Sequence, residues 1–375
     1  MIEVFGLGLV GLFGLVALCG LARVYLNPRR HRPSVMKAIL IVKVSSLGDV
    51  IHNIPMLYDL RVLYPQAQID WVVEEAFIDL LTPLPGLTRI IPLGLRRWKR
   101  EIKACRFTWL AELYRFIRHL RAVDYDLILD AQGLVKSALV ARLAKQTGVG
   151  TIVGLANRTA DSGYEPAVRF IYDQALTVPV ETHDVDRSRF VAGVTNRAEL
   201  GPPKFYPCMG TDSNPLDLQP DTYVLFFHAT AGEFKKWDRA NWIQLGQHLS
   251  SSGLKIILPW GDSAEQQESY ALAAQIPGAL VPRRCSLREY FPLIRQAKVT
   301  IGVDTGLMHL AAALNCPTVE IYVRTHKWKT EGYWHPCIAN LGDKGCPPSV
   351  THVLCELQKV HGLVNIGRQF INNVL

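Results

Sequence analysis

The sequence lacks the short motifs that mark several common classes of protein. Its eight cysteines form no C-x-x-C pair and no cysteine and histidine set at zinc spacing. Neither the G-x-G-x-x-G fingerprint nor a P-loop is present, and basic residues do not alternate with aromatic ones as in nucleic-acid-binding modules. Cys337, Cys346 and Cys355 are close in sequence, but no second ligand pair accompanies them. We therefore expect reduced thiols in a cytoplasmic protein, with no metal site, no cofactor and no nucleic-acid partner.

The composition is that of a globular protein with two cores. The chain has 375 residues, of which 49% are hydrophobic and 20% charged, and this length suffices for two domains of typical size. The formal net charge of +8 favours acidic partners, such as a phosphorylated substrate or an anionic membrane surface.

Residues 1–35 form an appendage. Val4–Ala22 contains no charged residue and is long enough for one membrane-spanning helix, with several arginines after it. A cleaved secretory signal fits poorly, because the basic residues follow the apolar stretch. Two alternatives stay open: an N-terminal membrane anchor, or upstream sequence that precedes a true start at Met36.

From Met36 onward, strand and helix patterns alternate, which is typical of doubly wound α/β domains. A proline-rich stretch in the middle predicts a linker between residues 36–205 and residues 206–375. If the two domains face each other, we expect a small ligand to bind in the cleft between them. The predicted strands are Ala38–Val44, Ile69–Val73, Leu127–Asp130, Tyr223–His228, Lys255–Leu258 and Val299–Val303. The predicted helices are Val50–Leu63, Val135–Lys145, Arg239–Ser250, Ala264–Gln275 and the segment from the Ser286 capping box to Ala297.

Two junctions between a strand and a helix carry candidate functional residues. Asp49 follows the first strand after a Ser-Ser-Leu-Gly turn, and Asp304 follows the strand Val299–Val303. Ligands of open α/β sheets bind at the carboxyl ends of the strands, so Asp49 is placed to accept a proton or to bind a hydroxyl. A plain helix N-cap is the alternative, and this segment taken alone favours it, because Asp is among the preferred N-cap residues. After Asp304, the backbone of Thr305 and Gly306 opens a helix, where amide groups and the helix dipole favour phosphate.

A basic segment, Arg96–Arg100, is predicted to form a loop before a long helix. Four cations surround Trp98, and they are Arg96, Arg97, Lys99 and Arg100. The segment is either a solvated helical face or a docking site for an anionic substrate, with Trp98 adding an apolar surface.

Further candidates lie in the second half. Thr230 and Lys235 follow a strand and are placed to reach a phosphate, although Lys235 also fits a surface charge. Glu265 ends the next strand region, where a carboxylate can accept ribose hydroxyls or complement a helix dipole. His309 lies one turn into its helix, where a structural role is more common than a catalytic one.

Several motifs in one order resemble the lipopolysaccharide heptosyltransferases of glycosyltransferase family 9. The resemblance runs from Met36 to the C-terminal helix and rests on Val44–Asp49, Asp70–Glu75, Arg96–Trp98, Asp130–Ser137, His228–Thr230, Leu258–Gly261 and Val303–Gly306. It implies a GT-B fold, in which two Rossmann-like domains face a cleft. It also implies transfer of L-glycero-D-manno-heptose from ADP-heptose to the Kdo region of lipid A.

The resemblance implies a role for each candidate residue. Asp49 is similar to the general base of an inverting displacement that needs no metal, and Lys235 with the start of the Thr305 helix would neutralise the diphosphate. The implied donor-binding residues are Thr230, Lys235, Glu265, Asp304, Thr305, Gly306 and His309. The implied acceptor-binding residues are Ser46, Gly48, Arg96, Arg97, Lys99 and Arg100. We expect a monomer at the cytoplasmic face of the inner membrane, peripheral or held by the N-terminal helix.

The sequence departs from the family pattern at two places. Ala231 replaces a hydroxyl residue after His-Ala-Thr, and Tyr322–Thr325 replaces a Tyr-Gly-Pro-Thr segment. These departures leave alternatives open: a family member with a different heptose step or nucleotide-sugar donor, a non-catalytic nucleotide-sugar-binding protein, or a GT-B epimerase.

Overall fold

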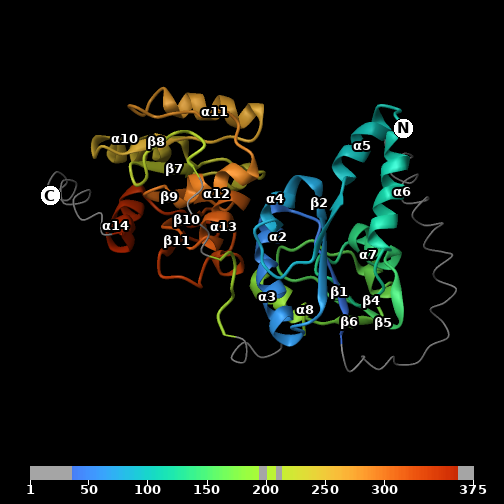
Figure 1. The fold of residues 1–375 in the computed structure, drawn as a ribbon. Coiled ribbons are helices and arrows are strands. Elements are labelled where there is room, and N and C mark those ends of the chain that lie inside the picture. The colour runs from blue at the N-terminus through green and yellow to red at the C-terminus, as the bar shows by residue number, and fades with distance from the viewer. Residues whose placement is uncertain (1–35, 194–200, 208–212, 362–375) are drawn as a thin grey trace. The chain divides into compact units, whose positions relative to one another are not determined.

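The chain forms two compact units, shown in Figure 1. A computed structural model describes residues 36–193, 201–207 and 213–361. The first unit runs up to Ser45 and from Asn53 to Gly201, and the second consists of Ser46–His52 and the residues from Pro202 onward. The predicted helix Val4–Ala22 lies outside the described residues. Within the described ranges, no helix is long and apolar enough to cross a membrane.

The first unit contains a six-stranded sheet in which all neighbouring strands run parallel. Strands β1 and β4 are buried along their whole length, as expected for a sheet covered on both faces. The strand order is β3-β2-β1-β4-β5-β6, which is the order of the Rossmann fold. The strands are β1 Ala38–Val42, β2 Gln68–Glu74, β3 Arg89–Leu93, β4 Tyr125–Asp130, β5 Gln146–Leu155 and β6 Gln174–Leu176.

The helices of the first unit are shorter than the sequence pattern predicted. The predicted helix Val50–Leu63 is broken at Asn53, ahead of Pro55, because proline lacks the amide proton and favours the first turn of a new helix. The helix that starts at Val135 ends at Leu143, and β5 begins soon after it. The helices are α3 Ile54–Leu63, α4 Ile78–Leu81, α5 Leu95–Lys103, α6 Thr108–Leu120, α7 Val135–Leu143 and α8 Asp184–Val191, with short 3₁₀ turns η2 Glu75–Phe77 and η3 Pro166–Phe170.

The second unit contains a five-stranded parallel sheet in the order β11-β10-β9-β7-β8. Its strands are β7 Tyr223–Phe227, β8 Lys255–Ile257, β9 Val299–Val303, β10 Thr318–Tyr322 and β11 Ile338–Gly342. Its helices are α2 Leu47–His52, α10 Arg239–Ser251, α11 Ser263–Ala273, α12 Leu287–Arg295, α13 Gly306–Ala313 and α14 Val350–His361, with 3₁₀ turns η4 Glu233–Lys235 and η5 Lys327–Lys329. The predicted capping box at the start of α12 is confirmed, since Ser286 and Glu289 bond to each other's backbone amides.

Both sheets reverse their winding at one point, and this point positions the candidate site. In the first sheet the reversal lies between β1 and β4, and in the second it lies between β7 and β9. Ligands of open α/β sheets bind beyond the carboxyl ends of the strands at such a switch point. The parallel α/β architecture predicted from the sequence is confirmed, and it directs attention to the residues that follow β7 and β9.

Candidate functional site

The two strands at the switch point of the second sheet bring Thr230 and Asp304 together. Thr230 follows β7 and Asp304 follows β9, and the two strands are hydrogen-bonded neighbours. The hydroxyl of Thr230 donates to the backbone carbonyl of Asp304 over 3.1 Å. The residues after these strands therefore form one connected polar centre.

The carboxylate of Asp304 lies between two cations. Lys235 Nζ lies 2.7 Å from Asp304 Oδ2, and His309 Nε2 lies 3.1 Å from Asp304 Oδ1. Asp304 is 6% exposed, so both pairs are largely shielded from water. Burial alone raises the pKa of Asp304, but His309 and Lys235 outweigh it and hold this pKa well below its usual range. Asp304 therefore stays ionised throughout the physiological pH range.

His309 is held between two buried carboxylates. Its Nδ1 lies 3.5 Å from Glu320 Oε1, opposite the contact with Asp304. Burial lowers the pKa of His309, but the two carboxylates outweigh burial and raise the pKa to about 9. The imidazole is therefore a cation at neutral pH, which makes His309 a fixed positive charge behind Asp304.

Glu320 is a functional candidate that the sequence interpretation missed. It lies in β10, is 1% exposed, and accepts hydrogen bonds from Tyr322 and from the backbone amide of Gly332 at 3.0 Å each. An acidic residue inside a buried strand was the available signal, because such a charge requires a partner. Tyr322, the first residue of the departing segment Tyr322–Thr325, thus supports the Asp304 and His309 pair through Glu320.

The start of α2 packs against the start of α13 within the second unit. A Cβ added to Gly306 would lie 2.4 Å from Leu47 Cδ2, and one added to Gly48 would lie 2.8 Å from His309 Cδ2. The rings of His52 and His309 have centroids 4.4 Å apart. Glycine at both positions thus permits a close approach of the two helix starts. This packing places the turn that carries Asp49 beside the start of α13.

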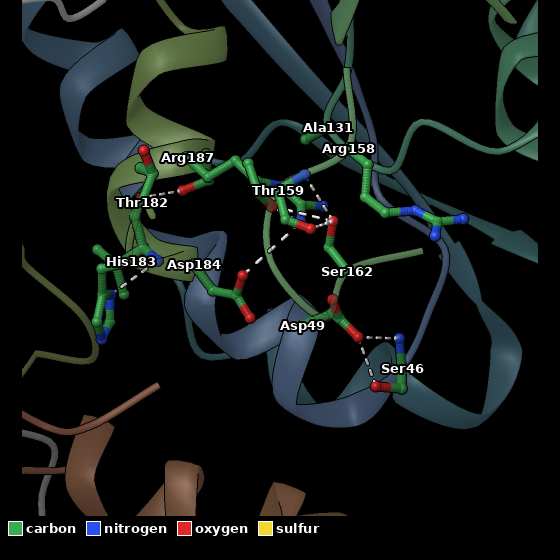
Figure 2. A network of polar contacts seen from close by, with 12 residues as sticks. Ser46, Asp49, Ala131, Arg158, Thr159, Ser162, Thr182, His183, Asp184 and Arg187 are labelled. Carbon is green, nitrogen blue, oxygen red and sulfur yellow. Dashed lines mark hydrogen bonds and ion pairs between the residues drawn. The ribbon is translucent and has the colours of Figure 1, made fainter. Parts of the chain in front are cut away.

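Asp49 is not the N-cap of its helix. Helix α2 begins at Leu47, so Asp49 lies in its first turn. Its Oδ2 accepts hydrogen bonds from the backbone amide of Ser46 at 3.0 Å and from the Ser46 hydroxyl at 2.6 Å, as Figure 2 shows. The N-cap interpretation of Asp49 is therefore wrong, because its carboxylate instead accepts from Ser46, the residue that precedes the helix. Ser46, Gly48 and Asp49 all belong to the second unit.

Glu265 lies in the first turn of α11, where its Oε2 accepts a hydrogen bond from the backbone amide of Gly261 at 2.6 Å. Nearby, His228 Nε2 lies 2.9 Å from the hydroxyl of Ser269. Burial lowers the pKa of His228 to about 4, so this imidazole is neutral at physiological pH. Glu265 is half-buried and makes a local backbone contact.

The basic segment Arg96–Arg100 is helical, which corrects the predicted loop. It lies within α5, and α6 is a separate helix. Trp98 is buried, and its indole nitrogen donates to Glu112 Oε2 over 2.7 Å. Trp98 thus anchors α5 and does not offer the predicted apolar surface.

The four cations of this segment differ in their surroundings. Arg97 pairs with Glu75 and Glu112, and its hydrogen bonds to these carboxylates raise its pKa further above the ordinary value. The exposed Arg96 guanidinium lies over the Phe77 ring, 5.0 Å from its centroid. Lys99 and Arg100 are exposed as well. Arg97 therefore acts in part as a structural ion pair, while the other three cations remain accessible to an anion.

The switch point of the first sheet holds a cluster of polar side chains that were not among the predicted site residues. Gln132 Oε1 accepts from the backbone amide of Val44 at 2.9 Å, and its Nε2 donates to the Ser45 hydroxyl over 3.3 Å. Lys136 Nζ lies 3.1 Å from the same hydroxyl. The sequence signal was the run Asp130–Ser137, which begins at the last residue of β4.

A second polar group of the first unit surrounds Thr159, as Figure 2 shows. The hydroxyl of Thr159 accepts from Arg187 at 3.1 Å and bonds to the hydroxyl of Ser162 at 2.9 Å. Arg187 and Thr159 are both buried, and Asp184 lies 3.7 Å from Arg187. These contacts fix the loop after β5 to the start of α8, and no sequence motif had indicated them.

Among the described residues, no group of three or more histidine, cysteine or acidic side chains is arranged to hold a metal ion.

The predicted donor residues Thr230, Lys235, Asp304 and His309 lie in one connected cluster of the second unit. The start of α13 belongs to the same cluster.

Comparisons with known proteins give the family. The sequence model of glycosyltransferase family 9 (heptosyltransferase) matches residues 113–361. Lipopolysaccharide heptosyltransferase 1 of Pseudomonas aeruginosa is 36% identical over 316 residues, which cover 83% of this chain and 85% of that protein.

Two solved structures of E. coli heptosyltransferase WaaC are also similar. The structure with ADP has a TM-score of 0.66 and 31% identity, and the match covers 90% of this chain and 99% of that one. The structure with ADP-2-deoxy-2-fluoro heptose has a TM-score of 0.64 and 30% identity, over 90% of this chain and 100% of that one. The chain therefore belongs to glycosyltransferase family 9, the heptosyltransferases.

Proposed function

We propose that this enzyme transfers L-glycero-D-manno-heptose from ADP-heptose to the Kdo region of lipid A, in the inner core of lipopolysaccharide. The names of its relatives and the ADP and ADP-heptose analogue bound to WaaC support this reaction. The observation that carries the proposal is the buried Asp304 carboxylate, paired with Lys235 and His309 at the switch point of the second sheet.

In this proposal the second unit binds the donor. Lys235 and the backbone at Thr305 and Gly306 neutralise the diphosphate, because a cation and a helix start both favour negative charge. Thr230 adds a hydrogen bond from its hydroxyl to a phosphate of the donor. Asp304, kept ionised by its two cations, accepts hydrogen bonds from heptose hydroxyls, and Glu265 accepts those of the adenosine ribose.

The transfer is a single displacement with inversion. The acceptor oxygen forms a bond to the anomeric carbon of heptose as the bond from that carbon to the ADP oxygen breaks. Asp49 takes the proton of the attacking hydroxyl, with Ser46 and Gly48 shaping its turn, and ADP leaves with the bonding electrons. Lys235 stabilises the charge that develops on ADP, so the proposed reaction needs no metal ion.

The remaining assignments concern the acceptor and the arrangement of the protein. We assign acceptor binding to residues 36–205 and donor binding to residues 206–375, as two GT-B domains facing a cleft. The cations of α5, Arg96, Arg97, Lys99 and Arg100, bind the phosphates and carboxylates of the acceptor. The enzyme works as a monomer at the cytoplasmic face of the inner membrane.

The test is a transfer assay with purified protein, Kdo-bearing lipid A and excess chelator, in which ADP-heptose is compared with other nucleotide sugars. Transfer from ADP-heptose at an unchanged rate under chelation is the expected result. Transfer only from another donor would point to the departing segment Tyr322–Thr325, and tight binding of ADP-sugars without any transfer would replace the proposal with a binding protein.

A further inference from the structure

An exposed apolar stripe runs along α6 of the first unit. Phe107, at the start of the helix, is 74% exposed, Leu110 is 46% exposed and Tyr114 is 63% exposed. Residues three, four and seven positions apart lie on one face of a helix, so the three side chains form a continuous outward stripe. No role in the proposed reaction accounts for this stripe.

The opposite face of α6 is firmly packed, so the exposure of the stripe does not come from a loose helix. Phe116 and Leu120 are buried, and the Phe116 ring lies edge-on to the Trp98 ring of α5 with centroids 6.0 Å apart. Glu112 is joined to Trp98 and Arg97. Figure 1 shows α5 and α6 joined end to end by a short turn.

Cations flank the apolar stripe. Lys103, the last residue of α5, and Arg106, in the turn between α5 and α6, are exposed, and so are Arg115 and Arg118 along α6. Between Lys103 and Arg121 the only acidic residue is Glu112, and its carboxylate is engaged by Arg97 and Trp98. Glu101 of α5 also reaches the start of α6, where it accepts from the Thr108 hydroxyl at 2.9 Å, and it pairs with Arg97. The exposed cations outnumber these two carboxylates, so the surface is positive as well as apolar.

We propose that the turn between α5 and α6, together with the outward stripe of α6, docks onto an anionic lipid surface. Aromatic side chains beside lysine and arginine suit the boundary between headgroups and acyl chains, because the rings enter it while the cations meet the anionic headgroups. The charge complementarity favours a lipid surface over an apolar protein partner, and the formal net charge of +8 acts in the same direction. The inference rests on this surface and not on the proposed reaction, although it would bring a lipid-bound acceptor to the first unit.

The test compares flotation of the full chain with vesicles of phosphatidylcholine alone and with vesicles that also contain phosphatidylglycerol. We expect tighter binding to the anionic vesicles than to the neutral ones. The double variants Phe107→Ser with Tyr114→Ser, and Lys103→Glu with Arg106→Glu, should each weaken binding by roughly tenfold or more.

The control is Phe170→Ser with Arg169→Glu. Phe170 is 82% exposed and Arg169 is exposed, but both lie in η3, away from α6 in the sequence. This variant should bind as the wild type does, and thermal melting should show that all variants are folded.

A local readout separates this surface from any other membrane contact of the chain. Hydrogen exchange followed by peptide mass analysis, with and without anionic vesicles, should show slower exchange in residues 103–110. The proposal is overturned if protection appears only elsewhere, if the Phe107 and Tyr114 variant floats like the wild type, or if neutral vesicles bind equally well. Turnover of a water-soluble Kdo acceptor should be the same in all variants, and its absence in the wild type would count against the proposed reaction alone.

Discussion

Asp304 and His309 form a buried ion pair in the second unit, with 3.1 Å between Asp304 Oδ1 and His309 Nε2. The pair is extended on one side by Lys235 and on the other by Glu320. Each carboxylate therefore has a cation beside it, which is the condition under which buried charges are tolerated. We expect this chain of alternating charges to fix the Asp304 carboxylate for donor binding, and four predictions follow from it and from its neighbours.

Lys235→Ala should weaken ADP binding by roughly ten- to a hundredfold, since a charge-assisted hydrogen bond to a phosphate contributes this much. The measurement is ADP affinity by calorimetry. Lys236→Ala is the matched control, because Lys236 pairs with the exposed Glu233 and should change affinity little. Equal losses in the two variants would mean that general positive charge, and not a direct contact of Lys235 with the diphosphate, governs ADP binding.

Asp49→Asn should lower turnover by roughly a hundredfold to ten-thousandfold while leaving ADP affinity almost unchanged, because only the proton acceptor is lost. Single-turnover rates and ADP titrations separate the two effects. Asp79→Asn provides the control, since Asp79 also lies in the first turn of a short helix. Wild-type turnover in the Asp49 variant would remove Asp49 from the proposed mechanism.

Gly306→Ala should destabilise the protein by roughly 1–3 kcal/mol, because its Cβ would overlap the Leu47 side chain. Since α2 carries Asp49, turnover should fall more than ADP affinity does. Adding Leu47→Ala to Gly306→Ala should restore part of the lost stability and part of the lost turnover. A double-mutant cycle measures this recovery. Gly148→Ala, where a Cβ meets nothing within 4 Å, should have a small effect. If Leu47→Ala brought no recovery, the packing of α2 on α13 would not be the cause.

The stability of the protein should depend on pH through His309. Its pKa in the folded protein, about 9, exceeds its ordinary value of 6.5, so its ion pairs contribute fully below pH 6.5. This contribution is lost as the pH rises from 6.5 through 9. The lowered pKa of Asp304 affects stability only in acid. The stability that its ion pairs contribute is lost as the pH falls below 3.8, the ordinary pKa of the carboxyl.

The measurement is the melting temperature of the wild type minus that of His309→Gln across this range. The difference should be largest near pH 6.5 and should shrink toward pH 9. Glu320→Gln removes one of the two carboxylates that raise the pKa of His309, so the loss should be complete at a lower pH. A difference that does not vary with pH would show that His309 contributes by packing alone.

The sequence by itself determined the α/β class and most of the elements around the candidate site. Buried parallel strands are continuous apolar runs, and the junctions at Asp49 and Asp304 follow such runs directly, so local pattern was enough to find them. The Ser286 capping box was equally readable, because its partners are three residues apart.

Only the tertiary structure decided which side chains meet. The contacts of Asp304 with Lys235, and of His309 with Glu320, join residues from different elements, and no local pattern encodes such pairs. The same holds for Trp98, which is buried although its neighbours in sequence are cations, because Glu112 of the next helix binds its indole. Periodicity reports which face of an element is buried, whereas a site depends on which elements the sheet order brings together, and that is a property of the whole fold.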